Sequence, residues 1–281
     1  MLRLTRAVRV AINPPGAQIP QSPNGFAGAP SMVGLGRHYE FLVSCRGEVD
    51  GASGYLIDIK AVDKSVRRAV LPMVEEACAN NALVDPLALL ARALPGLERE
   101  IVEEARRGPN GTVRLESVRW MLSPTYSVEM LTRDGQVGAV GLLRQRFDFA
   151  AAHRLNVPTL SPEKNRELFG KCNNPSGHGH NYQFEACVEV PVGDAAGVGF
   201  DLQTLERVAQ RAIIDRFDHK HLNVDTEEFC VERGGVNPSV ENIAKVFFGL
   251  LREAVAAEAR GVALRQITVW ETDRTSATYP A

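Results

Sequence analysis

Three histidines in the second half of the chain have the spacing of a metal site. His178 and His180 are two residues apart, so on a β-strand both side chains project from the same face. His153 lies in the preceding alternating segment, which would pair with that strand in a hairpin. Three neutral imidazoles that leave a fourth position open are typical of catalytic zinc. The sequence therefore predicts one zinc ion (Zn2+) bound by these three histidines.

Two other interpretations of the histidines have to be weighed. A single histidine in a protein is more often a hydrogen-bonded side chain than a metal ligand. A structural zinc finger needs further cysteines, and Cys172 has no second cysteine near it. Because all three histidines flank one cysteine, the pattern favours a catalytic metal site.

The elements that carry these residues belong to an internal repeat. Sliding the chain by 143 positions aligns residues 37–72 with residues 180–215 without a gap, so that Tyr39 falls on Tyr182. Each copy first alternates apolar and polar residues, as a strand with one buried face does. It then changes to the spacing of an amphipathic helix. An aligned stretch of this length indicates two copies of one structural unit.

Both copies predict the same order of elements. Asp58 and Asp201 are expected to cap a first helix in each copy. A second helix is expected over residues 86–105 and 239–257, and each half closes with further strand segments. The order strand, strand, helix, helix, strand, strand predicts an α+β fold, in which two helices cover one face of an antiparallel four-stranded sheet. Such a sheet has open edges, which self-association into a closed barrel would pair.

Length and composition agree with two domains and exclude several classes of protein. A chain of 281 residues predicts two domains, over residues 1–140 and 141–281. Its 32 Lys and Arg against 34 Asp and Glu exclude a general nucleic-acid binder. No apolar run approaches the ~20 residues of a membrane helix, and the N-terminus lacks the apolar stretch of a secretory signal. The five cysteines form no C-x-x-C pair, so we expect reduced thiols in a cytoplasmic protein.

The segment around the histidines resembles the 6-pyruvoyl-tetrahydropterin synthase family. Residues 169–182 read FGKCNNPSGHGHNY, and the family signature is FGKCNNPNGHGHNY, so that only Ser176 departs from it. Residues 151–153 match the family's AAH motif. The resemblance covers residues 147–279 and implies the T-fold, which the internal repeat extends to two tandem T-fold units.

The resemblance also implies acid–base residues. Cys172 takes the position of the family's catalytic cysteine, where a nearby metal and imidazole would favour the thiolate needed for proton transfer. An inert buried thiol is the alternative. The segment RFDHKHLN resembles the family's DHKNLN motif, which implies that His219 relays protons with Cys172 and that Asp218 orients it. The alternative is a solvated helix end, and His221 stands where the family has Asn.

Three more residues are implied to contact the substrate. Glu271, in VWETDRTSATY, resembles the family's late-strand ET motif, whose carboxylate accepts two parallel N–H hydrogen bonds from the pterin ring. An exposed strand glutamate is the alternative. Thr272 follows it, and Ser239 replaces the threonine of the family's P-T-x-E-N motif, which keeps a hydroxyl at that position.

The first half of the chain lacks these residues. Leu35 and Arg37 fall on His178 and His180, and nothing there corresponds to Cys172. We therefore expect one metal and one complete set of site residues per chain. The resemblance implies active sites at subunit or repeat interfaces of a homo-oligomer, so the first half is expected to serve in assembly.

The activity that the resemblance implies is a zinc-dependent lyase reaction. It converts 7,8-dihydroneopterin triphosphate to 6-pyruvoyl-tetrahydropterin with release of triphosphate. One alternative is a 6-carboxy-tetrahydropterin synthase of the queuosine and deazapurine pathway. Five residues separate Cys172 from His178, as in the pyruvoyl enzymes, whereas the carboxy enzymes often have three. A second alternative, a non-catalytic pterin-binding assembly protein, would need only the pterin anchor and not the complete set.

Overall fold

The computed structural model describes residues 1–18, 30–80, 83–108, 112–133, 136–192 and 200–281. These residues group into two compact units. The first contains Met1–Leu143, and the second contains Arg144–Val190 together with the described residues from 200 to the end.

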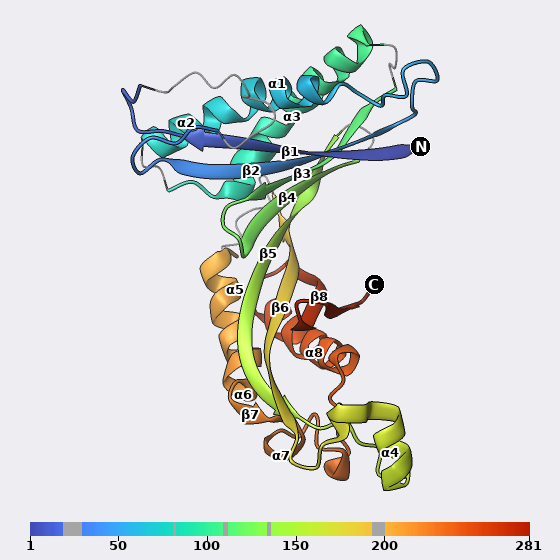
Figure 1. Ribbon diagram of the computed structural model, residues 1–281. Coiled ribbons are helices and arrows are strands. Elements are labelled where there is room, and N and C mark those ends of the chain that lie inside the picture. The colour runs from blue at the N-terminus through green and yellow to red at the C-terminus, as the bar shows by residue number, and fades with distance from the viewer. Residues whose placement is uncertain (19–29, 81–82, 109–111, 134–135, 193–199) are drawn as a thin grey trace. The chain divides into compact units, whose positions relative to one another are not determined.

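The first unit is an antiparallel sheet with helices on one face (Figure 1). Its strands lie in the order β1-β2-β3-β4. Alternate residues of the strands are buried, among them Val8 and Val10 on β1 and Phe41 and Val43 on β2, which is the period of two that a one-sided sheet requires. The elements are β1 (Leu2–Ile12), β2 (Arg37–Gly47), α1 (Ile59–Ala69), α2 (Leu71–Ala79), α3 (Pro86–Arg107), β3 (Arg114–Met121) and β4 (Tyr126–Arg133).

The second unit contains the strands that carry the candidate site. Strands β5, β6, β8 and β9 are neighbours in that order, and the short β7 pairs in parallel with β5. Helix α8 packs on β8 and β9. The elements are β5 (Gln136–His153), α4 (Pro162–Phe169), the 3-10 helix η1 (Gly170–Asn173), β6 (His178–Pro191), α5 (Leu202–Ala209), the π-helix η2 (Gln210–Ile214), α6 (Asp215–Phe217), β7 (Lys220–His221), α7 (Leu222–Asp225), the 3-10 helix η3 (Val231–Arg233), α8 (Val240–Glu258), β8 (Ala263–Thr272) and β9 (Thr275–Tyr279).

The mixed α/β fold and its antiparallel sheet agree with the prediction, but two separate four-stranded sheets are not confirmed. The described strands form one path, β1-β2-β3-β4-β5-β6-β8-β9. Strand β5 is 18 residues long and continues from the residues of the first unit into those of the second. No turn signal breaks its sequence after Gly141, so nothing local ends the strand between the two repeats.

Capping hydrogen bonds confirm the two predicted helix starts at Asp58 and Asp201. The Asp58 carboxylate accepts a backbone N–H in the first turn of α1 at 2.9 Å, and Asp201 does the same for α5 at 2.8 Å. The second helices, α3 and α8, also begin where the pattern placed them. The pattern missed α2 and α4, which each have a proline in the first turn, where no intrahelical N–H bond is lost.

No helix among the described residues combines the length and the apolar composition that crossing a lipid bilayer would require.

The core of the second unit predicts a large cost for truncating one aromatic residue. Phe247 on α8 is fully buried, and its ring lies 5.0 to 5.5 Å from the rings of Phe149, Phe184 and Phe217. We expect Phe247→Ala to lower the free energy of unfolding by about 3–5 kcal/mol, because the site cannot collapse around the lost ring. Urea unfolding measures this. The neighbouring half-buried Phe248, changed to Ala as a control, should cost much less, and equal losses would contradict this account of the core.

Candidate metal centre and active site

The strand ends bring the three predicted histidines together. His153 is the last residue of β5, and His178 and His180 lie at the start of β6. The Nε2 atoms of His153 and His178 are 3.2 Å apart, and one nitrogen of each of the three rings lies within 4.8 Å of the other two. The predicted cluster is therefore present in the fold.

A backbone carbonyl sets the tautomer of His153. Its Nδ1 lies 2.7 Å from the carbonyl oxygen of Pro238, which can only accept a hydrogen bond. The proton is accordingly assigned to Nδ1, so the Nε2 lone pair faces the cluster. Metal-bound histidines commonly donate their other ring N–H to a carbonyl in this way. The carbonyl therefore orients His153 as a ligand.

The geometry fits a divalent ion such as zinc. Nitrogens that bind one tetrahedral zinc at 2.0–2.1 Å are about 3.3 Å apart, which is close to the His153–His178 separation. The Nε2 atom of His180 is buried and has no hydrogen-bond partner among the described residues. A buried nitrogen without a partner is costly unless another group takes it up. A metal ion at this point would satisfy it.

Burial keeps these imidazoles in the form that a metal binds. His153 is fully buried, and burial lowers its pKa to about 4. Burial also lowers the pKa of His180, against the opposing charge of Glu271. Both rings are thus neutral near pH 7, as metal ligation requires.

Glu271 lies against the histidine cluster. Its Oε1 atom, on β8, is 3.4 Å from His153 Nε2 and 3.6 Å from His180 Nε2. The side chain is 19% exposed, so Glu271 is only partly covered by the protein. Thr272 beside it is exposed, and its hydroxyl accepts the backbone N–H of Arg274 at 3.3 Å.

Cys172 lies on η1 and is half-buried. Burial raises the pKa of its thiol, and the nearby Glu271 carboxylate raises it further. The protein groups alone therefore favour the protonated thiol. A cation at the histidine cluster would act in the opposite direction.

Asp218 and His219 form a second, separate group. The Asp218 carboxylate accepts the Ala150 N–H and the His219 Nδ1–H, both at 2.8 Å. Its pKa is lowered chiefly by the hydrogen bond from Ala150 and then by His219. The His219 N–H in turn donates to the Ala150 carbonyl, and its φ of 55° is a left-handed value that few non-glycine residues adopt. These contacts hold the ring outward, with its side chain 82% exposed.

A pocket of about 480 Å³ is lined by residues of both the histidine cluster and the Asp218–His219 pair. It is lined by residues 150–152, 179–181 and 219–221, so it includes His180 and His219 but neither Cys172 nor Glu271. Within the described residues no hydrogen bond connects Cys172 with His219. A proton relay between these two residues therefore stays a prediction.

Ser239 has an internal contact of its own. Its hydroxyl accepts the Asn242 N–H at 3.4 Å and caps α8. The residue before it is Pro238, whose carbonyl holds His153. The cap therefore fixes the loop whose carbonyl orients His153.

Two positioning residues were not expected from the sequence. The side chain of Asn223 pairs with both backbone groups of Arg154, at 2.8 and 3.0 Å, and so fixes the chain directly after His153. The ring of Tyr182 lies edge-on to His153 and His180. Both residues lie inside the motifs that carry the family resemblance, and that was the available signal.

Comparison with known proteins agrees with this geometry. Residues 142–281 match the family model of 6-pyruvoyl tetrahydropterin synthase. The human 6-pyruvoyl tetrahydrobiopterin synthase is 35% identical over 150 residues, which are 53% of this chain and 98% of the human protein. The Poecilia reticulata protein of the same name is 33% identical over 140 residues, 50% of this chain and 90% of that protein.

Among solved structures, the 6-pyruvoyl tetrahydropterin synthase of Caenorhabditis elegans is similar at 32% identity and a TM-score of 0.43, and the match covers 50% of this chain and 94% of that one. Because sequence identity above 30% extends over nearly all of the human relative, the chain belongs to the 6-pyruvoyl tetrahydropterin synthase family.

Proposed function

We propose that the protein is a zinc-dependent lyase that converts 7,8-dihydroneopterin triphosphate to 6-pyruvoyl-tetrahydropterin and releases triphosphate. The observation that carries this proposal is the convergence of three imidazoles on one point that Glu271 also reaches. Relatives named 6-pyruvoyl tetrahydrobiopterin synthase support the reaction. The complete set of acid–base residues argues against a protein that only binds pterins.

The proposed zinc site uses His153, His178 and His180, and the bound ion would supply Lewis-acid polarisation of the substrate's side-chain oxygens. Glu271 would accept the two parallel N–H groups at the edge of the pterin ring. The Glu271 carboxylate lies 3.4 Å from His153 Nε2, which supports this role. A pterin ring bound to Glu271 would place the substrate's side chain next to the three histidines. Thr272 and Ser239 would add hydroxyl contacts, as far as their internal hydrogen bonds allow.

Proton transfer is assigned to Cys172 and to the Asp218–His219 pair. Asp218 holds Nδ1 of His219, so Nε2 is the atom that can take or give a proton at the substrate. Because no described contact joins His219 to Cys172, the two groups would act on different atoms of one substrate or across a boundary between chains. The second arrangement agrees with a homo-oligomer, which we propose as the functional state.

The tandem arrangement is part of the proposal. Residues 141–281 would form the catalytic T-fold domain, and residues 1–140 a degenerate T-fold repeat that serves in assembly. The five cysteines are free thiols, which agrees with a cytoplasmic protein.

A carboxy-forming synthase on the same substrate is the second candidate. The five-residue spacing between Cys172 and His178 favours the pyruvoyl product. Mass spectrometry of the product from 7,8-dihydroneopterin triphosphate separates the two: acetaldehyde and a carboxylated pterin would indicate the second reaction.

The metal assignment predicts a loss of zinc from one histidine variant. His180→Ala removes the buried Nε2 atom from the cluster, so bound zinc should fall from about one per chain to near zero, as measured by elemental analysis after dialysis. His38 is an exposed histidine in the first unit, and His38→Ala should keep the metal. Full zinc content in the His180 variant would contradict the site.

The role of Cys172 predicts a loss of turnover without a loss of metal. Cys172→Ala should lower kcat for 7,8-dihydroneopterin triphosphate by about 10²- to 10⁴-fold, the range of a general acid–base group, while zinc content and KM change little. Cys187→Ala removes a core thiol on β6 and should keep kcat. Unchanged turnover in the Cys172 variant would remove it from the mechanism.

The role of Glu271 predicts a change in substrate recognition. Glu271→Gln keeps the shape but cannot accept two charge-assisted hydrogen bonds, so kcat/KM should fall by roughly 10- to 100-fold at unchanged zinc content. If zinc is lost together with activity, the carboxylate is a metal ligand and not the pterin anchor.

A further inference from the structure

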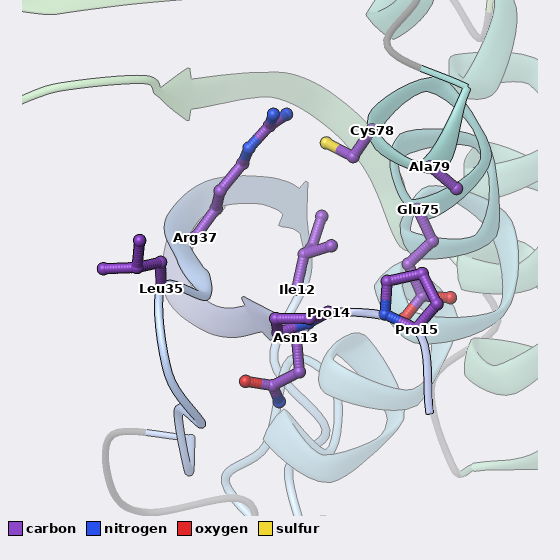
Figure 2. A pocket seen from close by; sticks show the side chains of 9 residues that line it. All are labelled: Ile12, Asn13, Pro14, Pro15, Leu35, Arg37, Glu75, Cys78 and Ala79. Atoms are coloured by element: carbon purple, nitrogen blue, oxygen red, sulfur yellow. The ribbon is translucent and has the colours of Figure 1, made fainter. Parts of the chain in front are cut away.

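The first unit has a pocket of its own, of about 300 Å³. It lies where β1 ends, β2 begins and α2 ends, and Figure 2 shows its side chains. Ile12, Pro14 and Leu35 give it apolar surface. Its polar side chains include Arg37, Glu75 and Cys78. This volume is at the lower end of the range for small-molecule sites.

The internal repeat relates this pocket to the candidate active site. At the shift of 143 positions, Arg37 falls on His180 and Cys78 falls on His221. Both members of each pair line a pocket in their own unit. Glu75 falls on Asp218 by the same shift. The first unit has therefore kept a hollow at the repeat-equivalent place, although it has lost the histidines that would bind a metal.

The polar groups of this hollow lie at opposite ends. In Figure 2 the Arg37 guanidinium and the Cys78 sulfur point to one end, and the Glu75 carboxylate points to the other, beside Pro15. A hydrogen bond to the Cys78 sulfur, and then the neighbouring Tyr39, raise the pKa of Arg37. Within the described residues no carboxylate pairs with Arg37 and no cation pairs with Glu75. Neither charge is therefore neutralised by an opposite charge there, and an ionic ligand could pair with each, with Arg37 keeping its contact to Cys78.

This arrangement matches one kind of small molecule. A guanidinium binds an oxyanion through two parallel N–H groups. A carboxylate accepts the two N–H groups of an aminopyrimidine edge in the same paired geometry. The apolar residues between them suit the face of a flat ring. The ligand therefore carries an oxyanion at one end and a ring with N–H donors at the other.

We propose that the pocket of the first unit binds a second molecule of a phosphorylated pterin, without a metal and without turning it over. Naming this ligand rests on the proposed function, because the same class is the proposed substrate. The phosphate lies against Arg37 and the pterin edge against Glu75. The first repeat would thus still bind the ligand but no longer convert it.

The first test is the number of ligands bound per chain. In the full-length Cys172→Ala protein, which leaves the probe intact, calorimetric titration with 7,8-dihydroneopterin triphosphate should give two molecules per chain. Adding Arg37→Gln or Glu75→Gln should reduce this to one. Adding Arg92→Gln, an exposed arginine on α3 outside the pocket, should leave two. One molecule per chain in every variant would overturn the proposal.

The second test reads the pocket directly through Cys78. Alkylation of this half-buried thiol by iodoacetamide, followed by peptide mass spectrometry, should slow about tenfold when the ligand is present at ten times its Kd. The protection should persist after zinc is removed by a chelator, and Arg37→Gln should abolish it. Neopterin and inorganic triphosphate, tested separately, should each protect more weakly than the joined molecule.

The two tests separate this inference from the proposed function. If the unmodified protein fails to turn over 7,8-dihydroneopterin triphosphate but Cys78 is still protected, the pocket stands and the catalytic assignment falls. If turnover is normal and Cys78 reacts at the same rate with and without the probe, the catalytic assignment stands and the pocket does not bind a phosphorylated pterin.

Discussion

The candidate site depends on one buried hydrogen bond, between Nδ1 of His153 and the carbonyl of Pro238. A buried imidazole can rotate or change tautomer, and only one of these states presents a lone pair to the other two histidines. The carbonyl selects that state, and burial keeps the ring neutral. The loop that carries Pro238 is held in turn by the Ser239 cap on α8. The position of one helix therefore decides whether three histidines form a ligand set.

The charged groups around the histidine cluster act differently on Cys172 and on the Asp218–His219 pair. Burial and, after it, the Glu271 carboxylate raise the pKa of Cys172, so the protein groups alone favour the protonated thiol. A positive charge at the histidine cluster would act in the opposite direction and favour the thiolate. Asp218 and His219 are held differently, because hydrogen bonds to the Ala150 backbone anchor them at the edge of the pocket. Different neighbours thus shift the pKa of Cys172 and the pKa of Asp218.

The two halves of the sequence share a pattern of strand and helix but not the histidines of the candidate site. Both halves have an alternating strand, β2 and β6, followed by an Asp-capped helix, α1 and α5, and alternate residues of both strands are buried. These features depend on apolar burial, which tolerates exchange among residues of similar size. Metal ligation does not tolerate such exchange, because Leu35 and Arg37 offer no donor to a metal in place of His178 and His180. A polar pocket nevertheless remains in the first unit, where the Arg37 guanidinium takes the position that aligns with His180.

The sequence by itself determined the local elements and the shared face of His178 and His180 on their strand. Alternation with a period of two places His178 and His180 on one face, and the Asp caps mark where the helices begin, because both are properties of neighbouring residues. It could not supply contacts between distant segments. The Pro238 carbonyl reaches His153 across 85 positions and Ala150 reaches Asp218 across 68, and both depend on how α8 and β7 pack against β5. The continuity of the sheet through β5 and the approach of Glu271 to the imidazoles are likewise decided only when the strands are packed. Local periodicity carries no information about which distant backbone group will lie opposite.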